Sequence, residues 1–285
     1  VGSEMCIRDS GTDPLSPRNP LILTTGPFAG TAAAAASRLV VGCRSPLTGT
    51  VLDSYAGGSF APELKYAGYD MVIVTGRSAE PVVVRIEDDR VSFDPALPDL
   101  WGMSTSDFEE TMRERHGSDV KVLSTGRAGE NQVPFACLST DQSHKAGRGG
   151  AGAVMGSKNL KGIVVRGTGA VTVGDMRSFT AQMLRLLHER VWTDDNFWAV
   201  EEGTPFLVEP VNDGGGLPTR NWQTGSFEGA AAIDSRSLLA RRTKVRACAQ
   251  CPVACRQVHR FGDLVCEGPE YETCLLYTSP SPRDS

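Results

Sequence analysis

Short apolar or β-branched runs recur through the first 166 residues of the chain, and glycine, proline or charged residues separate most of them. Runs of this length and composition are typical of β-strands. The polar residues at 87–90 have the composition of a hairpin turn between two such runs. The pattern predicts strands at residues 21–24, 39–42, 71–74, 82–86, 120–123 and 163–166.

Helical spacing of apolar residues appears at 106–117 and becomes prevalent after residue 172. Ser106 and Glu109 match a capping box, and Gly117 suits the C-terminal end of that helix. Asp175 can cap a longer helix with one apolar side, made of Met176, Phe179, Met183, Leu184, Leu187 and Val191. Shorter helices are predicted near Pro62, at 206–211 and at 235–242.

This order of elements predicts an α+β protein. We expect a β-rich domain with pseudo-barrel-like sheets at residues 11–170, followed by the beginning of a mostly helical domain at 171–273.

The two ends of the chain are complementary at the level of DNA. The run from Cys274 to Asp284 can be encoded by DNA whose reverse complement, in another frame, encodes Val1 to Asp9. Unrelated protein termini do not match in this way. We therefore expect residues 1–10 and 274–285 to be a translated sequencing adapter, and the native part to be a fragment.

Composition narrows the class of protein. The formal net charge of −5 gives no electrostatic reason to expect nucleic acid or an anionic membrane as a partner. Residues 21–42 carry a single charge, Arg38, but contain too much glycine, threonine and proline for a membrane span. The cysteine usage suits a reducing compartment, which predicts a cytoplasmic location.

Three thiols, Cys248, Cys251 and Cys255, lie within eight residues. Disulfides between such close neighbours are strained, and an odd number leaves one thiol over. Short loops do allow several sulfurs to converge on one inorganic group. The spacing favours an iron–sulfur cluster, with zinc as the alternative.

A glycine-rich segment, residues 147–156, is the second chemical feature. Its backbone N–H groups can approach a phosphate, and Lys145, Arg148 and Lys158 add positive charge for an anionic ligand. The segment lacks the ending of a P-loop, and a purely structural turn is the alternative. Gly57 and Gly58 form either an anion-binding turn or a purely structural turn. The side chain of Arg38 either extends to water or pairs with an anion.

Three carboxylates, Glu267, Glu270 and Glu272, follow the thiols. They form either a solvated turn or a place for proton transfer. The four histidines show no metal-ligand spacing and are expected to be surface or structural residues, while Cys43 and Cys137 are expected in the core.

Taken in order, these motifs resemble the tungsten-containing aldehyde ferredoxin oxidoreductase family over nearly all of residues 12–273. The resemblance is carried by Asp13-Pro-Leu-Ser-Pro17, Gly26-Pro-Phe-Ala-Gly-Thr31, Ser45-Pro-Leu-Thr-Gly49, Glu63-Leu-Lys-Tyr-Ala-Gly-Tyr-Asp70, Ala128-Gly-Glu-Asn131, residues 146–161, Asn221-Trp-Gln-Thr-Gly225, Cys248 to Cys255 and Glu267-Gly-Pro-Glu-Tyr-Glu272.

The resemblance implies a β-rich base for a bis-pterin tungsten or molybdenum cofactor, with a magnesium ion bridging the pterin phosphates and a [4Fe–4S] cluster close by. It implies oxidation of a small aldehyde to a carboxylic acid, with two electrons passing through the cluster to ferredoxin or another carrier. A homo-oligomer is compatible with it.

Residue by residue, the resemblance places Arg38, Gly57, Gly58, His144, Lys145, Gly147 and Arg148 beside the pterin. Cys248, Cys251 and Cys255 match three cluster ligands, and the fourth lies further downstream in the family. Glu272 matches a glutamate near the metal and is the expected proton acceptor. Tyr55 and His144 depart from the asparagine and arginine that can occur at these positions.

Two other functions remain as alternatives. One is a pterin- and cluster-bearing subunit of a larger reductase complex, for instance one that reduces an aromatic acyl thioester. The other is a zinc-stabilised binding module without catalysis. If the family reading holds, the chain of 285 residues is expected to be inactive by itself, because the domains that close the substrate pocket are missing from it.

Overall fold

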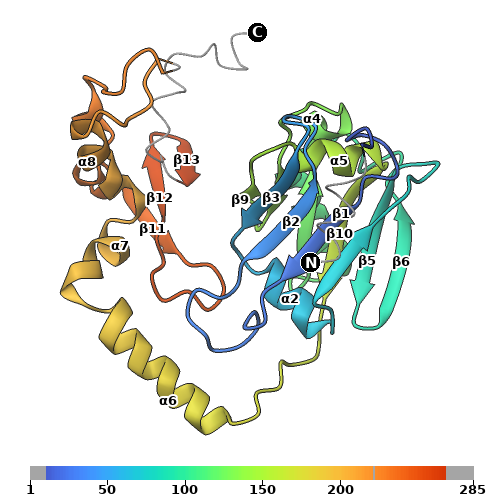
Figure 1. The fold of residues 1–285 in the computed structure, drawn as a ribbon, viewed down its shortest axis with the longest axis horizontal. Coiled ribbons are helices and arrows are strands. Elements are labelled where there is room, and N and C mark those ends of the chain that lie inside the picture. The colour runs from blue at the N-terminus through green and yellow to red at the C-terminus, as the bar shows by residue number, and fades with distance from the viewer. Residues whose placement is uncertain (1–10, 221, 268–285) are drawn as a thin grey trace. The chain divides into compact units, whose positions relative to one another are not determined.

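The computed structural model describes residues 11–220 and 222–267 (Figure 1). Within that range the chain forms two compact units. The first runs to Met176 and also includes Cys248–Gln250; the second comprises Arg177–Ala247 and the chain from Cys251 onward. Mixed sheets and helices confirm the predicted α+β class.

A four-stranded antiparallel sheet opens the first unit. Its strand order is β3-β2-β1-β4. The strands are β1 (Leu21–Thr25), β2 (Leu39–Arg44), β3 (Val51–Ala56) and β4 (Met71–Val74). Leu21, Leu23, Leu39 and Val41 are fully buried, which explains why these two apolar runs form the central strands.

A six-stranded sheet completes the first unit, with the order β6-β5-β10-β7-β8-β9. Its strands are β5 (Val82–Glu87), β6 (Arg90–Pro95), β7 (Lys121–Thr125), β8 (Leu138–Thr140), β9 (His144–Ala146) and β10 (Leu160–Arg166). Only β5 and β10 pair in parallel among these strands. The edge strand β9 lies beside β3, the edge strand of the first sheet (Figure 1).

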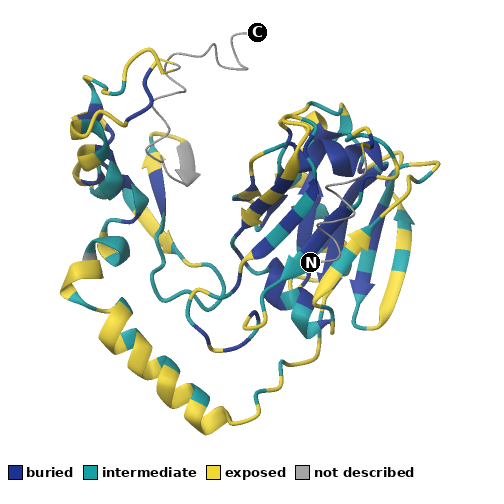
Figure 2. Cartoon of the chain, viewed as in Figure 1, coloured by how far each residue is buried: buried dark blue, intermediate teal, exposed yellow. Residues whose placement is uncertain are grey.

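Four helices belong to the first unit: α2 (Phe60–Tyr66), α3 (Thr105–His116), α4 (Arg127–Glu130) and α5 (Ala151–Ser157). One continuous core joins both sheets with α2 and α5, and every residue of α5 is buried (Figure 2). Phe108 and Met112 of α3 pack in a second cluster with Val122 and Val164 of the larger sheet.

The start of α3 differs from the prediction. Ser104, not Ser106, is the N-cap, and its Oγ accepts a hydrogen bond from the Asp107 N–H at 3.1 Å. The helix therefore begins two residues before the position that the capping-box pattern indicates, and Ser106 lies inside its first turn. Gly117 occupies the C-cap, with φ +103°.

The second unit contains short helices and a small sheet. Its elements are α6 (Met176–Leu186), whose first residue is counted with the first unit, η1 (Leu187–Val191), η2 (Asp194–Asn196), α7 (Phe197–Glu201), η3 (Thr204–Leu207), α8 (Val208–Asp213), η4 (Ala230–Ala232), α9 (Ser235–Leu239), β11 (Arg242–Arg246), β12 (Arg256–Phe261) and β13 (Leu264–Glu267). The antiparallel sheet β11-β12-β13 was not predicted. Val208, Leu217, Ala230 and Ile233 form the core of this unit.

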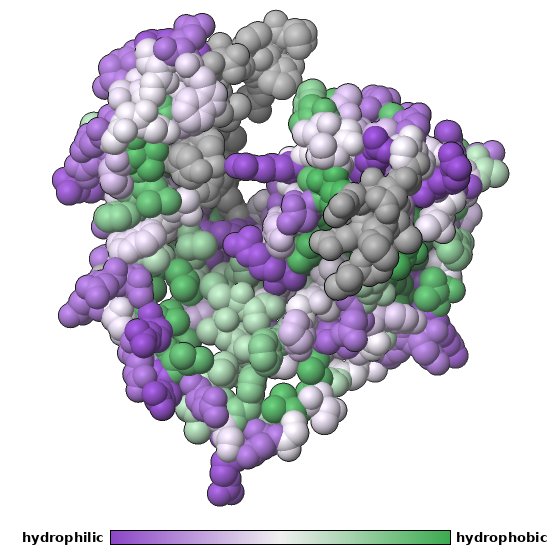
Figure 3. Space-filling model, viewed as in Figure 1, coloured by the Kyte–Doolittle hydropathy of each residue, from purple (hydrophilic) through white to green (hydrophobic). Residues whose placement is uncertain are grey.

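The predicted amphipathic helix is present as α6 and η1, but none of its described residues is buried. Hydrophilic and hydrophobic residues lie side by side along it in the space-filling view (Figure 3). Among the described residues, no helix is long and apolar enough to cross a membrane.

Candidate functional site

The predicted site residues of the first unit gather where β3 ends. Ala56 closes β3 and pairs with Leu39, the first residue of β2. Arg38, just before β2, and Gly57, just after β3, therefore lie at the same end of this strand pair. Arg38 is exposed there, and Gly58 has a left-handed φ of +95° that favours glycine.

The β8–β9 hairpin brings His144 to the same place. Its turn residues Asp141 and Gln142 have φ values of +48° and +63°. The Asp141 carboxylate accepts hydrogen bonds from the backbone N–H of Ser59 at 2.5 Å and from the Ser59 hydroxyl at 2.8 Å. This contact ties the hairpin turn to the segment that follows Gly58, and His144, the first residue of β9, is buried.

Cys248, the first thiol of the cysteine motif, meets His144 at this position. His144 Nε2 and Cys248 Sγ are 3.1 Å apart. A Cβ atom at Gly57 would lie 2.7 Å from Cys248 Sγ and 2.9 Å from His144 Cδ2. A Cβ atom at Gly58 would lie 2.2 Å from Asp141 Oδ2. Glycine at both positions therefore allows the backbone to lie this close to the side chains of Cys248, His144 and Asp141.

Four hydrogen bonds fix the start of the cysteine motif to the first unit. Ala249 N–H donates to the Gly58 carbonyl at 3.1 Å. Gln250 is bound on both sides: its carbonyl accepts from Ala35 N–H at 3.2 Å and its Oε1 accepts from Ser37 Oγ at 2.8 Å. Its Nε2 also donates to the Tyr66 hydroxyl at 3.1 Å. Residues 248–250 therefore form a clip, which we call the 248–250 clip.

The other two thiols belong to the second unit. Cys251 and Cys255 are partly buried, and the Cys255 carbonyl lies 2.4 Å from the position that a Cβ atom at Gly203 would take. None of the cysteines with described side chains forms a disulfide. Within the described residues, no three His, Cys, Asp or Glu side chains are grouped as metal ligands. Glu272, Glu270 and both chain ends lie outside the described residues.

The glycine-rich segment divides into two parts. In its second part, glycine permits close packing: a Cβ atom at Gly150 would lie 1.9 Å from the Pro134 carbonyl oxygen, and one at Gly156 would lie 1.9 Å from that of Gly129. In its first part, Gly147 is exposed, and a Cβ atom there would make only ordinary contact with Lys145 at 3.8 Å. Lys145 and Arg148 are exposed beside it, so only the residues up to Arg148 are open to a ligand.

Lys158 does not supply charge to that surface, contrary to the prediction. Its side chain is buried, and its ammonium group donates to the carbonyls of Pro17 at 3.2 Å and Gly76 at 3.3 Å. Burial lowers the pKa of Lys158 to about 8, and the nearby Cys43 opposes this shift. Lys158 thus holds two loops of the first unit together.

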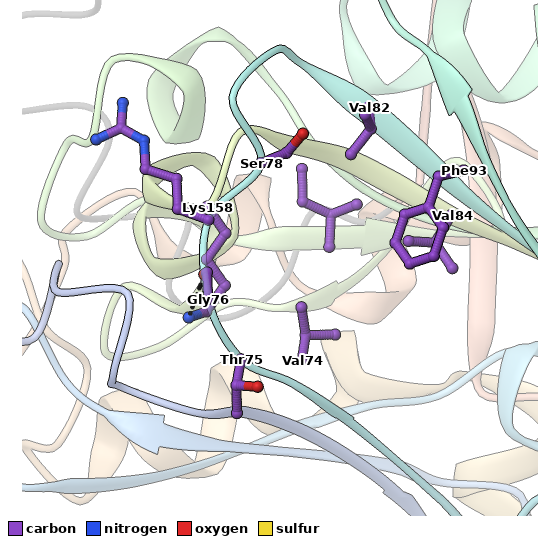
Figure 4. Close-up of a pocket in the computed structure, with 10 residues that line it drawn as sticks. Val74, Thr75, Gly76, Ser78, Val82, Val84, Phe93 and Lys158 are labelled. Atoms are coloured by element: carbon purple, nitrogen blue, oxygen red, sulfur yellow. Dashed lines mark hydrogen bonds between the residues drawn. The ribbon is translucent and has the colours of Figure 1, made fainter.

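A cavity of about 330 Å³ lies at the other edges of the two sheets. Val74 of β4 and Phe93 of β6 line it with Val82 and Val84 of β5. Figure 4 shows the Lys158 amine hydrogen-bonded to Gly76 at its border. Lys158 lines this cavity, but Arg38, Gly57, Gly58 and residues 144–148 do not, so the cavity is separate from the candidate site.

Sequence reasoning missed the residues that support the site. Glu109 on α3 is buried, its Oε2 accepts from Gln142 N–H at 2.7 Å, and its Oε1 is 2.7 Å from Arg113. Burial raises the pKa of Glu109, while the Gln142 N–H and Arg113 lower it. The supporting roles of Asp141, Ser59 and Gln250 were not predicted either. The polar residues at 139–143 are the sequence feature that indicates a structured turn.

Replacing Gly57 with alanine is expected to lower the free energy of unfolding by about 1–3 kcal/mol, because the new methyl group must displace His144 or Cys248. Urea denaturation measures this change. Gly26→Ala is the matched control, because its Cβ atom would meet only the Ala36 carbonyl at 3.9 Å. Equal stability of the two variants would contradict the close approach at Gly57.

Comparison with known proteins gives matches along most of the chain. Residues 2–167 match the family "Aldehyde ferredoxin oxidoreductase, N-terminal domain", and residues 182–281 match "Aldehyde ferredoxin oxidoreductase, domains 2 & 3". The chain is 39% identical over 273 residues to the tungsten-containing aldehyde ferredoxin oxidoreductase of Pyrococcus furiosus, covering 93% of this chain and 44% of that protein. Identity, coverage and length are the same for the Thermococcus kodakarensis protein of that name.

More distant relatives have other reactions in their names. The WOR-like subunit of an aliphatic sulfonate oxidoreductase from Pyrococcus furiosus is 28% identical over 284 residues, covering 91% of this chain and 44% of that protein. The solved structure of the active-site complex BamBC of benzoyl coenzyme A reductase, with 1,5-dienoyl-CoA, matches with a TM-score of 0.75 and 26% identity. That match covers 99% of this chain and 48% of the other. The chain thus spans less than half the length of these relatives.

Proposed function

The chain belongs to the aldehyde ferredoxin oxidoreductase family, and from this premise we propose that it provides the pterin platform and three cluster thiols of an enzyme that oxidises aldehydes to carboxylic acids. One observation carries the proposal: Cys248 lies against His144 and Gly57 within a single compact unit. A proposed cluster ligand and the proposed pterin surface therefore meet in one place.

The residues present suit an anionic, sulfur-rich cofactor. Gly147 exposes main chain beside Lys145 and Arg148, whereas Gly57 and Gly58 let the His144 ring lie directly on the backbone. Arg38, just before β2, adds a further exposed positive charge. These residues would hold the pterin and its phosphates, together with a magnesium ion, because exposed amides and fixed cations are the groups that bind phosphate.

Cys248, Cys251 and Cys255 form no disulfide, and their thiols would hold a [4Fe–4S] cluster. The fourth ligand would come from elsewhere in the complete protein. In the proposed reaction, an aldehyde and water give a carboxylic acid, two protons and two electrons, and the bound metal–pterin group and the cluster supply the redox chemistry that passes those electrons to ferredoxin. Glu272 would accept a proton from the attacking water or the substrate.

A second candidate function is supported by the structural match to the benzoyl coenzyme A reductase complex. In that case the same platform would belong to a subunit that reduces an aromatic acyl thioester. The higher identity to aldehyde ferredoxin oxidoreductases, 39% against 26%, favours aldehyde oxidation. Assays of the complete protein with an aldehyde and an artificial electron acceptor, and with an aromatic acyl thioester and a reductant, distinguish the two functions.

Metal analysis of the complete protein tests the proposal most directly. We expect a brown protein with about four iron atoms and about one tungsten or molybdenum atom per chain. Anaerobic purification followed by elemental analysis measures both. A colourless protein that contains zinc and no iron would instead identify the zinc-stabilised binding module.

A further inference from the structure

The contact between His144 and Cys248 joins the proposed pterin platform to the proposed cluster. The 3.1 Å separation of His144 Nε2 and Cys248 Sγ is short for a hydrogen bond to sulfur. Both residues belong to the first unit, and the 248–250 clip fixes the backbone beside Cys248. The contact is therefore a property of one compact unit.

The imidazole ring of His144 has little freedom to turn. A Cβ atom at Gly57 would lie 2.9 Å from its Cδ2, and one at Gly58 would lie 3.1 Å from its Nδ1. The ring therefore packs directly on the two glycines. His144 pairs with Thr140 across the hairpin, so its backbone is fixed as well.

The turn that carries His144 is supported from two sides. Asp141 binds Ser59 through both the backbone N–H and the hydroxyl. Glu109 on α3 accepts the Gln142 N–H and is paired with Arg113. These contacts hold the imidazole in one place before any cofactor binds, which is the condition for a preorganised second layer around a metal site.

We propose that His144 is a positioning residue whose Nε2–H donates a hydrogen bond to the Cys248 sulfur, orienting this thiolate for the cluster and raising the cluster's reduction potential. The proposal rests on the proposed function, in which Cys248 is a cluster ligand. Reduction adds negative charge that is shared by the ligand sulfurs. A donor aimed at one of them stabilises the reduced state more than the oxidised state.

The test compares His144→Phe with His144→Gln in the complete protein, purified anaerobically. Phenylalanine keeps a planar ring but has no donor, whereas the glutamine side-chain amide can place an N–H near the position of His144 Nε2. A redox titration followed by electron paramagnetic resonance gives the midpoint potential of the cluster. At the wild-type midpoint, we expect the ratio of reduced to oxidised cluster to fall about tenfold in His144→Phe, equivalent to about 59 mV for one electron.

The glutamine variant is expected to restore most of that ratio. His116→Phe makes the same chemical change at the end of α3 and should leave the potential unchanged. Iron content and circular dichroism are measured on every variant. A folded His144→Phe protein that lacks iron, beside a glutamine variant that retains it, would also support the proposal.

Two results would overturn the inference while leaving the proposed function intact. One is an unchanged potential in an iron-loaded His144→Phe protein. The other is loss of iron from both variants, because donation of an N–H would then not be the property that matters. A wild-type protein without an iron–sulfur cluster would overturn the inference and the proposed function together.

Discussion

Replacing Lys161 with alanine will lower the free energy of unfolding of the first unit by about 3–5 kcal/mol. Lys161 of β10 is fully buried, and its ammonium donates to the Glu130 carboxylate at 2.5 Å and to the Met103 carbonyl at 2.8 Å. Burial lowers the pKa of Lys161, and the Glu130 carboxylate opposes that shift. Truncation leaves the Glu130 charge buried without its cation. Because whole domains are stable by about 5–15 kcal/mol, this loss is large.

The matched control lies on the same strand. Arg166 pairs with Asp119 at 2.8 Å, but both side chains are about half exposed, so Arg166→Ala should cost no more than about 1 kcal/mol. Urea denaturation followed by circular dichroism measures both variants. The double variant Lys161→Met with Glu130→Gln should recover part of the loss, because Glu130 also accepts the Gly102 N–H and glutamine keeps an acceptor there. Similar losses for Lys161→Ala and Arg166→Ala would refute this account.

The substitution Gly156→Ala is the second change with a large expected effect, about 3 kcal/mol or more of lost stability. In a helix interior alanine normally stabilises relative to glycine by about 1 kcal/mol. Here the sign reverses, because the added Cβ would lie 1.9 Å from the Gly129 carbonyl oxygen and 2.5 Å from the Gly129 carbonyl carbon. These are backbone atoms of α4, so the whole α4–α5 contact must open.

Gly174→Ala is the control for this substitution. Its Cβ atom would meet nothing within 4 Å, and its φ is not in the left-handed region, so the expected change is within about 0.5 kcal/mol. The midpoint and slope of urea denaturation are compared for the two variants. A Gly156→Ala protein as stable as the wild type would show that α4 and α5 do not pack as closely as described.

The sequence allowed the central strands to be predicted but not the polar ones. All six apolar runs are strands, and most of their Leu, Ile and Val side chains are buried in the two core clusters of the first unit, although Ile73 of β4 is exposed. Strand β3 was missed because its alternation is inverted: Ser54 and Ala56 face the core, while Val51 and Tyr55 are exposed. Tertiary packing determines whether such a segment forms a strand, and the local pattern of apolar residues does not indicate it.

The small sheet of the second unit was missed for a related reason. β11 has the sequence Arg-Thr-Lys-Val-Arg, and β12 buries Gln257 and His259 together with Val258. Charged and amide residues gave no period-two apolar pattern there. Pairing of β12 with its neighbours β11 and β13 forms the sheet, although the apolar pattern of each strand alone does not predict it.

The sequence predicted the site residues that have distinctive chemistry, but not the residues that hold them in place. Cysteine spacing and glycine pairs are local features, so Cys248, Gly57 and Gly58 could be identified from the sequence. The roles of Asp141 and Gln250 depend on partners 82 and 213 residues away, respectively. Lys158 was assigned to a ligand because its neighbours in sequence are glycines, whereas the fold directs it to two carbonyls.

The 248–250 clip has a consequence for the order in which the protein is made. Ala35, Ser37 and Tyr66 are synthesised early, but their partner Gln250 leaves the ribosome only after a further stretch of roughly seventy residues has followed the rest of the first unit. During that interval the nascent platform lacks the segment that brings its sulfur into place. A cofactor of the proposed kind that arrived during this interval would meet a surface that lacks Cys248.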